Sequence, residues 1–237
     1  MLILAFESSA KPASVAVFEQ NTNEDSGLLQ SGKLIGQYFQ NNGFSHSRTL
    51  LSMAESLLKN LELKPCDINL VAVANGPGSF TGVRIGVSAA KGLAWGLDIP
   101  ICGVSTLEAM AFQTRFDDTI ICPVMDARRD QVYNALFKWQ GDTLVRLCDD
   151  RAISIEDLYR DLQKYTSPYL LVGDGTSVCQ NNEAFTDCPV VPELMRYQAA
   201  YGVALAAVHA KPMPAVELEP FYLRPSQAER ERNDEIR

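Results

Sequence analysis

The sequence has few of the residues from which enzyme active sites are usually built. Among 237 residues there are only two histidines, His46 and His209, and they lie far apart. Neither has a partner at the spacing that is typical of metal ligands, and no serine–histidine–aspartate arrangement can be argued. We therefore expect no metal site and no catalytic residue in this chain.

Long apolar runs and paired cysteines are also missing. No apolar run reaches the about 20 residues that a membrane-spanning helix needs. Residues 1–6 lack a basic leader and are followed by Glu7, so we expect no signal peptide. The six cysteines are irregularly spaced, without a Cys-x-x-Cys pair. Their even number leaves a disulfide framework open, but a chain of this size does not need one. We predict reduced thiols and a cytoplasmic location.

Basic residues are outnumbered by acidic ones, 21 against 29, which gives a net charge of −8. Nucleic-acid-binding proteins usually carry a basic patch, because neutralising phosphates supplies much of their affinity. Here the basic residues are scattered, apart from Arg128–Arg129 and several near the C-terminal end. If an RNA is the final substrate, we expect another protein to hold it.

Two successive sets of strand-like and helix-like segments are present. The first set predicts strands at 2–6, 13–18, 28–40, 67–74 and 101–104, with helices at 47–60, 81–97 and 105–114. The second predicts strands at 119–125, 131–139, 144–147 and 169–172, with helices at 155–165 and 197–210. This order predicts an α/β fold with two lobes, residues 1–106 and 107–225, and a charged, frayed tail at 226–237. It is compatible with a duplicated actin-like fold.

The helix at 81–97 has an unusually wide apolar surface. At about 100° per residue, its polar face consists of Arg84, Ser88, Lys91 and Trp95. The remaining arc is wider than the roughly 100° stripe of a one-sided helix, so two sides should be buried. Either a larger core or a protein partner could cover the second side. The glycine and alanine at positions 82, 86 and 90 would let another helix approach closely.

Residues 75–86, Asn-Gly-Pro-Gly-Ser-Phe-Thr-Gly-Val-Arg-Ile-Gly, form the sharpest local motif. They join a predicted strand to a predicted helix, whose free N-terminal amides attract anions. A phosphate site is one interpretation, but the P-loop requires Gly-Lys followed by Ser or Thr, which is missing. We favour a tight turn whose glycines let strand and helix approach each other.

Three polar segments at strand ends are weaker candidates. Glu7-Ser8-Ser9 stands where an actin-like ATPase holds phosphate and metal, although a carboxylate there is more often a cap. Asp126-Ala127-Arg128 could orient a ligand, but a surface ion-pair cluster is favoured. Gly173-Asp174-Gly175 would either approach an adenine or turn the chain.

Taken in order, these motifs resemble those of the TsaB (YeaZ) family. The resemblance rests on residues 5–9, 76–86, 103–107, 125–129, 172–175 and 220–224, and so covers essentially the whole chain. The Gly-Pro-Gly-Ser-Phe-Thr-Gly stretch is highly specific. The family implies two actin-like lobes of the acetate kinase/Hsp70/actin superfamily, with RNase H-like topology. It also implies a role in threonylcarbamoylation of the adenosine 3′ of the anticodon, in tRNAs that read codons beginning with A.

The resemblance separates this chain from the family's catalytic relative, TsaD. In TsaD two histidines of a Val-His-His-Met-Glu-Gly-His stretch hold the metal, and the matching positions here are Thr106 and Met110. Threonine and methionine cannot replace two imidazoles as ligands of a divalent ion. The resemblance thus implies a non-catalytic scaffold that binds TsaD and the ATPase TsaE and reaches tRNA through their complex. Whether the isolated chain forms a homodimer stays open.

Two sets of site residues follow from the resemblance and the helix pattern. The degenerate nucleotide cleft would comprise Glu7, Ser8, Asp126, Arg128, Gly173, Asp174 and Gly175. The docking surface, for TsaD or for a second copy, would comprise Leu50, Leu51, Ala54, Leu57, Val83, Gly86, Val87, Ala89, Ala90 and Leu93. Because Glu7 replaces the usual Asp and the second segment lacks a glycine pair, we expect no tightly bound cofactor, and ATP or ADP only within the complex. The competing hypothesis is an actin-like small-molecule kinase or ATPase that uses Glu7 and Asp126.

Overall fold

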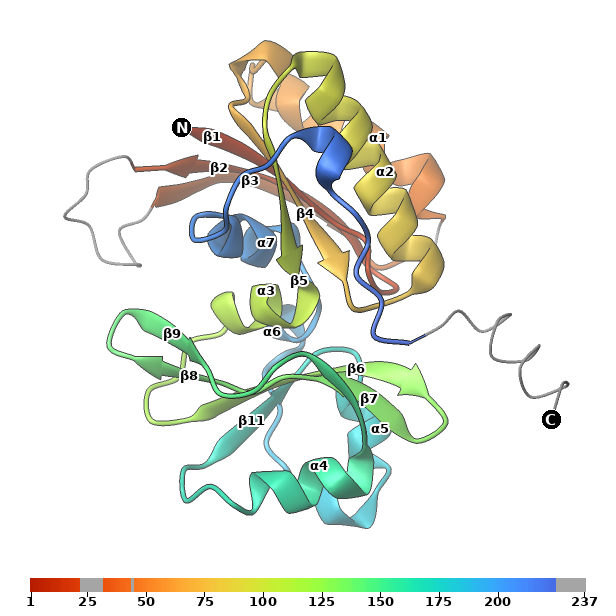
Figure 1. The fold of residues 1–237 in the computed structure, drawn as a ribbon, viewed down its shortest axis with the longest axis vertical. Helices are drawn as coiled ribbons and strands as arrows, with labels where there is room; N and C mark the ends of the chain where they lie inside the picture. Colours follow the sequence, from red (N-terminus) through yellow and green to blue (C-terminus); the bar gives the residue numbers. More distant parts are fainter. Residues whose placement is uncertain (22–31, 44, 225–237) are drawn as a thin grey trace, which may run out of the picture.

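The computed structural model describes residues 1–21, 32–43 and 45–224 and contains two α/β lobes (Figure 1). The strands of the first lobe are β1 (Leu2–Glu7), β2 (Ala13–Gln20), β3 (Gly32–Gln40), β4 (Leu70–Gly76) and β5 (Ile101–Ser105), in the order β3-β2-β1-β4-β5. The first three pair antiparallel, whereas β4 and β5 run parallel to β1. Helices α1 (His46–Asn60) and α2 (Phe80–Leu97) pack on one face, where their apolar stripes meet the sheet.

The second lobe is built around β6 (Ile120–Arg128). Its other strands are β7 (Gln131–Asn134), β8 (Phe137–Gln140), β9 (Thr143–Arg146), β10 (Arg151–Ser154) and β11 (Tyr169–Val172). Strand β11 pairs parallel to β6, and β7 and β8 pair antiparallel to it. The short helices α4 (Ile155–Leu162), α5 (Thr176–Gln180) and α6 (Glu193–Arg196) complete this lobe. The predicted α/β, two-sheet architecture is confirmed.

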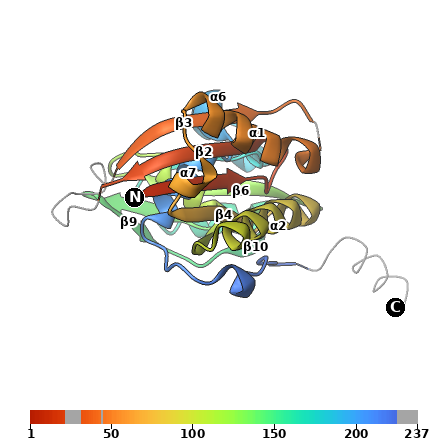
Figure 2. The ribbon, with the colours of Figure 1, turned by 90° about the horizontal axis from the view of Figure 1, so that it is seen from above.

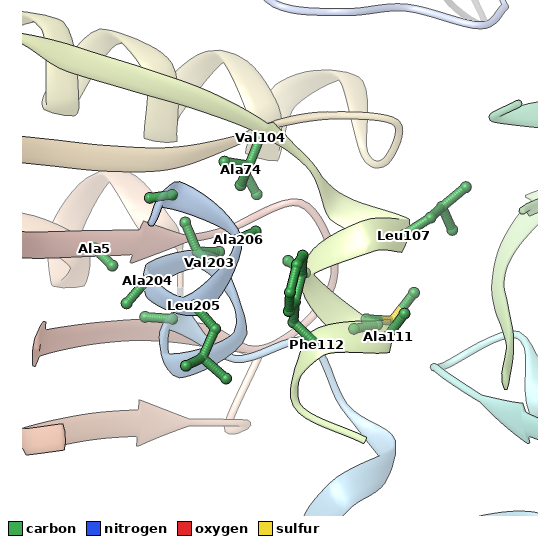
Figure 3. Close-up of a cluster of buried hydrophobic side chains, with 14 of the residues drawn as sticks. Ala5, Ala74, Val104, Leu107, Ala111, Phe112, Val203, Ala204, Leu205 and Ala206 are labelled. Carbon is green, nitrogen blue, oxygen red and sulfur yellow. The ribbon is translucent and has the colours of Figure 1, made fainter. Parts of the chain in front are cut away.

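Two helices join the lobes through one continuous apolar core. They are α3 (Thr106–Phe112) and α7 (Ala200–Ala207), which lie side by side between the sheets (Figures 1 and 3). The core around them includes Ala5 and Ala74 of the first sheet together with Met125 and Phe137 of the second. A Cβ on Gly202 would lie 2.2 Å from the carbonyl oxygen of Ala109, so only glycine permits this approach of α7 to α3.

The predicted boundary of the second lobe, residues 107–225, is wrong in its last part. Helix α7 covers the face of the first sheet opposite α1 and α2, because that face is apolar and would otherwise be exposed. After α7 the chain continues along the first lobe as the segment 213–224, here called the C-terminal strap. It starts at a β-bridge between Met213 and Ile101 of β5 and includes a short 3-10 turn at Ala215–Glu217.

Other sequence predictions differ from the structure in detail. The strand predicted at 131–139 is two strands, and β10 was not predicted. The helix predicted at 197–210 begins later, because Tyr197 and Gln198 instead bond Gln113 and Asp174. Ser45 is the N-cap of α1, but its hydroxyl bonds Ser47 rather than a backbone amide. The start of the strand predicted at 28–40 and the tail at 226–237 lie outside the described residues. Among the described residues, no helix is long and apolar enough to cross a bilayer.

Candidate functional site

A cleft of about 840 Å³ lies between the lobes and is lined by residues of both, none of them from α3 or α7. Its walls come from the loop after β1, the start of α1, the start of α2, the end of β6 and the C-terminal strap. Of the predicted cleft residues, Asp126, Arg128 and Asp174 line it. The other four, Glu7, Ser8, Gly173 and Gly175, are buried behind its walls. The strand ends therefore do converge, but only part of the predicted set reaches the cleft.

Glu7 is fully buried at the end of β1. Its Oε1 accepts a hydrogen bond from the Ser9 amide at 2.6 Å, while Oε2 has no partner. Burial raises the pKa of this carboxyl to about 7, and the charge of Asp174 acts in the same direction. A carboxylate that is sealed from solvent cannot receive metal-bound ATP in this conformation, which argues against the kinase hypothesis.

The Asp126 carboxylate is hydrogen-bonded within the β6–β7 hairpin, so it is not available to a ligand in this conformation. Its Oδ1 accepts from the Arg128 amide at 2.7 Å, and its Oδ2 from the Arg128 guanidinium at 3.0 Å. Arg128 sits in left-handed backbone with φ 66°, so this carboxylate helps to hold a strained turn. The structure contains one ion pair of the predicted kind here, between Arg128 and Asp126.

The Gly173-Asp174-Gly175 segment turns the chain against β6. Gly173 has φ 113°, and a Cβ there would lie 2.1 Å from the carbonyl oxygen of Val124. The Gly175 amide donates to the same oxygen at 3.1 Å. Asp174 accepts from Gln198 at 2.7 Å, and burial raises its pKa. These glycines face the protein's own backbone, which favours the turn over an adenine contact.

The glycine motif at 75–86 serves close packing. Ser8 donates its hydroxyl to the carbonyl oxygen of Gly82 at 2.9 Å. A Cβ on Gly82 would lie 2.2 Å from the Ser8 carbonyl oxygen, and one on Gly86 would lie 2.3 Å from the Ser8 hydroxyl. The tight-turn interpretation is confirmed. The expectation that these positions admit another helix is wrong, because the end of β1 occupies the space.

The two positions that the family resemblance aligns with the metal ligands of TsaD lie inside the core. Thr106 is 0% exposed and Met110 1% exposed, and both belong to α3 at the junction of the lobes. The sulfur of Met110 lies 3.2 Å from the place where a Cβ on Gly173 would stand. Thioether and hydroxyl groups in such surroundings pack against apolar neighbours and offer a divalent ion neither imidazole nor carboxylate.

The structure narrows the predicted docking surface. Seven of its ten residues are buried within the first lobe and cannot touch a partner in this conformation: Leu50, Ala54, Leu57, Val83, Gly86, Val87 and Ala90. Ala89 and Leu93 are half-buried, and Leu51 is 53% exposed. The exposed strip of α2 runs through Ser88, Gly92 and Trp95, and Trp95 is 82% exposed. The helix is thus buried on one side only in the isolated chain.

The C-terminal strap was missed as a partner of α2. Residues 220–224 were recognised as a motif, and Arg84 and Lys91 as a polar face, but nothing in the sequence connects the two. In the structure Lys91 donates to the carbonyl oxygen of Leu218 at 2.7 Å, and Arg84 donates to the Tyr222 hydroxyl at 2.8 Å. The strap and α1 lie on opposite sides of α2 (Figure 2).

Comparison with known proteins places this geometry in a family. The family model described as TsaD, tRNA N6-adenosine threonylcarbamoyltransferase, matches residues 42–213. The tRNA threonylcarbamoyladenosine biosynthesis protein TsaB of Bacillus subtilis strain 168 is 36% identical over 178 residues, 75% of this chain and 73% of that protein. Its Escherichia coli K12 counterpart is 30% identical over 183 residues, 74% and 72% of the two chains. The chain belongs to the TsaB (YeaZ) family.

Solved structures agree on the fold. YeaZ from Pseudomonas aeruginosa has a TM-score of 0.73 and 21% identity, covering 94% of this chain and 99% of that one. A second P. aeruginosa structure, described as an uncharacterized protein with similarity to peptidase YeaZ, has a TM-score of 0.74 and 22% identity over 94% and 99% of the chains. The predicted pair of actin-like lobes is confirmed.

Proposed function

We propose that this chain is a non-catalytic subunit in the biosynthesis of threonylcarbamoyladenosine in tRNA, and that it acts by binding and activating the transferase TsaD. The names of its relatives from B. subtilis and E. coli support the pathway. The observation that carries the non-catalytic role is the burial of Thr106 and Met110, at the positions of TsaD's two metal-binding histidines. The transfer chemistry is then left to the partner.

The exposed strip of α2 is the proposed docking surface, together with Leu51 of α1. Ser88 and Gly92 present little side chain, and a Cβ on Gly92 would meet nothing within 4 Å. Small residues let a second helix approach the backbone, and Trp95, 82% exposed, offers a large apolar contact beside them. TsaD is the proposed occupant within the complex, a second copy of this chain in its absence, and TsaE joins the assembled pair.

The charge of the chain supports an indirect role toward tRNA. A net charge of −8 gives little drive to release counterions from phosphates, so we infer that TsaD holds the tRNA. Any ATP or ADP would be bound within the complex. The chain would act by population shift, because it binds best to the conformation of TsaD that holds adenylate and tRNA productively.

Reconstitution tests the proposal. TsaD, TsaE, ATP, tRNA and pre-made threonylcarbamoyl-adenylate are combined with and without this chain, and modified tRNA is counted per TsaD over repeated turnovers. We expect turnover only when the chain is present. Full turnover without it would refute the activating role, and modification by the chain without TsaD would refute the non-catalytic role.

A further inference from the structure

The C-terminal strap is attached to α2 at Lys91, Arg84 and Phe80 before it leaves the first lobe. Lys91 donates to the carbonyl oxygens of Val216 at 3.1 Å and Leu218 at 2.7 Å. The Lys91 ammonium group therefore fixes the backbone of the strap at two carbonyl oxygens. Two residues of the polar face of α2, Arg84 and Lys91, therefore hold the strap, while Ser88 and Trp95 stay exposed.

The strap then lies directly on the glycine motif. The Asn75 side chain donates to the carbonyl oxygen of Glu219 at 3.2 Å, and the Asn75 carbonyl accepts from the Phe221 amide at 2.6 Å. Gly76 has φ 126°, and a Cβ there would lie 2.1 Å from the Phe221 carbonyl oxygen. The close approach of the strap thus requires a glycine at the first position of the motif.

Aromatic and cationic contacts hold the next turn of the strap. The Tyr222 ring stacks on Phe80 with centroids 4.7 Å apart. The Arg84 guanidinium lies 3.8 Å from the Phe80 ring centroid, and its Nε donates to the Tyr222 hydroxyl. Such stacked cation–aromatic arrangements stabilise a contact at a surface where apolar burial is small.

The strap ends on the other lobe. Arg224 donates to the carbonyl oxygen of Ala127 in β6 at 2.9 Å, and residues 221–224 form one wall of the inter-lobe cleft. The α3–α7 junction also joins the lobes (Figure 1), through two helices that contribute no residue to the lining of this cleft. The lobes are therefore connected twice, by a packed core that can serve as a pivot and by a peptide that lines the cleft.

We propose that the C-terminal strap is a clasp that fixes the angle between the two lobes and whose release opens the cleft. The strap contacts residues 75–84 in the first lobe and Ala127 in the second. Two of the motifs that carry the family resemblance, 76–86 and 220–224, are thus the two halves of one intramolecular contact.

Hydrogen–deuterium exchange and small-angle scattering test the clasp on the full chain. Arg224→Met, which has no N–H donor, removes the second-lobe bond, and Tyr222→Ala removes the first-lobe stack. Arg160→Met, at an arginine of α4 whose side chain is 71% exposed, is the matched control. We expect both variants to raise amide exchange several-fold in peptides of both lobes, at 76–86 and at 124–134, and to increase the radius of gyration, with the control unchanged.

Two results would overturn the clasp. Faster exchange confined to 76–86, with an unchanged radius, would mean that the strap only packs locally on the first lobe. Unchanged exchange in both lobes would mean that the strap holds neither. Arg224→Lys, which keeps the donor and the charge, should restore part of the protection at 124–134 and so separates the bond from a general effect of the substitution.

Discussion

The Ser8 hydroxyl lies 2.3 Å from the place where a Cβ on Gly86 would stand, and it donates to the carbonyl oxygen of Gly82 at 2.9 Å. One serine therefore fits the end of β1 into the first turns of α2. This contact explains why the motif contains glycines one helical turn apart. The packing role of the motif can therefore be tested by measuring the free energy of unfolding of glycine substitutions.

Gly86→Ala should lower the free energy of unfolding by about 1 kcal/mol. Overpacking costs about 1–3 kcal/mol, and the better helix propensity of alanine returns about 1 kcal/mol. In a Ser8→Ala background the nearest remaining atoms are 3.5 and 3.7 Å away, so the same change should become neutral or stabilising. Gly92→Ala, with open space around it, is the control and should stabilise by about 1 kcal/mol. Urea titrations give the free energies of unfolding of Gly86→Ala, Ser8→Ala, the double variant and Gly92→Ala. Equal changes for the two glycine substitutions would contradict the packing argument.

Glu7 should make stability fall as pH rises. Burial raises its pKa from 4.5 to about 7, so between these values the folded chain keeps a proton that the unfolded chain releases. The stability that comes with that proton is present below about pH 4.5 and is lost by about pH 7, a change of about 3 kcal/mol. Glu7→Gln should remove this part of the pH dependence in denaturant titrations at about pH 5 and about pH 8. An unchanged slope in the variant would show that Glu7 is ionised in both states.

Ser88→Arg should abolish binding of TsaD while the chain stays folded. Ser88 is exposed, so the arginine costs nothing in the free chain, but docking a helix there would bury an unpaired charge, at a cost of about 3 kcal/mol or more. Glu156→Arg on α4, at a side chain 74% exposed in the other lobe, is the control. Binding is measured by titration calorimetry and folding by circular dichroism. Ala90→Arg is unsuitable, because Ala90 is 0% exposed and an arginine there would unfold the lobe.

Replacing Arg146 should lower the free energy of unfolding more than replacing an exposed arginine. It bonds Asp150 at 2.5 Å and Glu108 at 3.0 Å, and it lies over the Phe137 ring. Arg146→Met leaves Asp150, whose side chain is 9% exposed, without its cation, and should cost about 2 kcal/mol once partial exposure is allowed for. Arg160→Ala removes an ion pair with Asp157 in which the Arg160 side chain is 71% exposed. It should change the free energy of unfolding by no more than about 0.5 kcal/mol. Similar losses for both would contradict a buried role for Arg146.

Local sequence pattern predicted most elements but not what interrupts them. Residues 131–139 alternate as one strand, and in the structure β7 and β8 keep one register along β6. By that register Pro123 lies opposite Ala135, and proline has no N–H to contribute to the ladder. The strand is therefore broken by a residue on its neighbour. No pattern within 131–139 contains that information.

Burial on α2 was harder to predict, for a related reason. The wide apolar arc was visible in the sequence, yet composition cannot say which part of an arc meets the chain's own core. Val83, Val87 and Ala90 face the sheet, whereas Ser88 and Gly92 face outward. The strap contacts of Arg84 and Lys91 join positions more than a hundred residues apart, as the separation of Arg84 and Tyr222 by 138 illustrates. Such pairs are fixed by tertiary structure and leave no periodic signal.

The position of α7 has a consequence during synthesis of the chain. The first sheet is complete once residue 105 has emerged, but the helix that covers its second face begins at Ala200. Until then Ile3, Phe18 and Leu70, each at most 1% exposed in the finished protein, have no cover. A ribosome-bound intermediate would therefore display an apolar sheet face while the whole second lobe is being made. We expect this nascent chain to depend on chaperones, and a fragment that ends near residue 106 to aggregate.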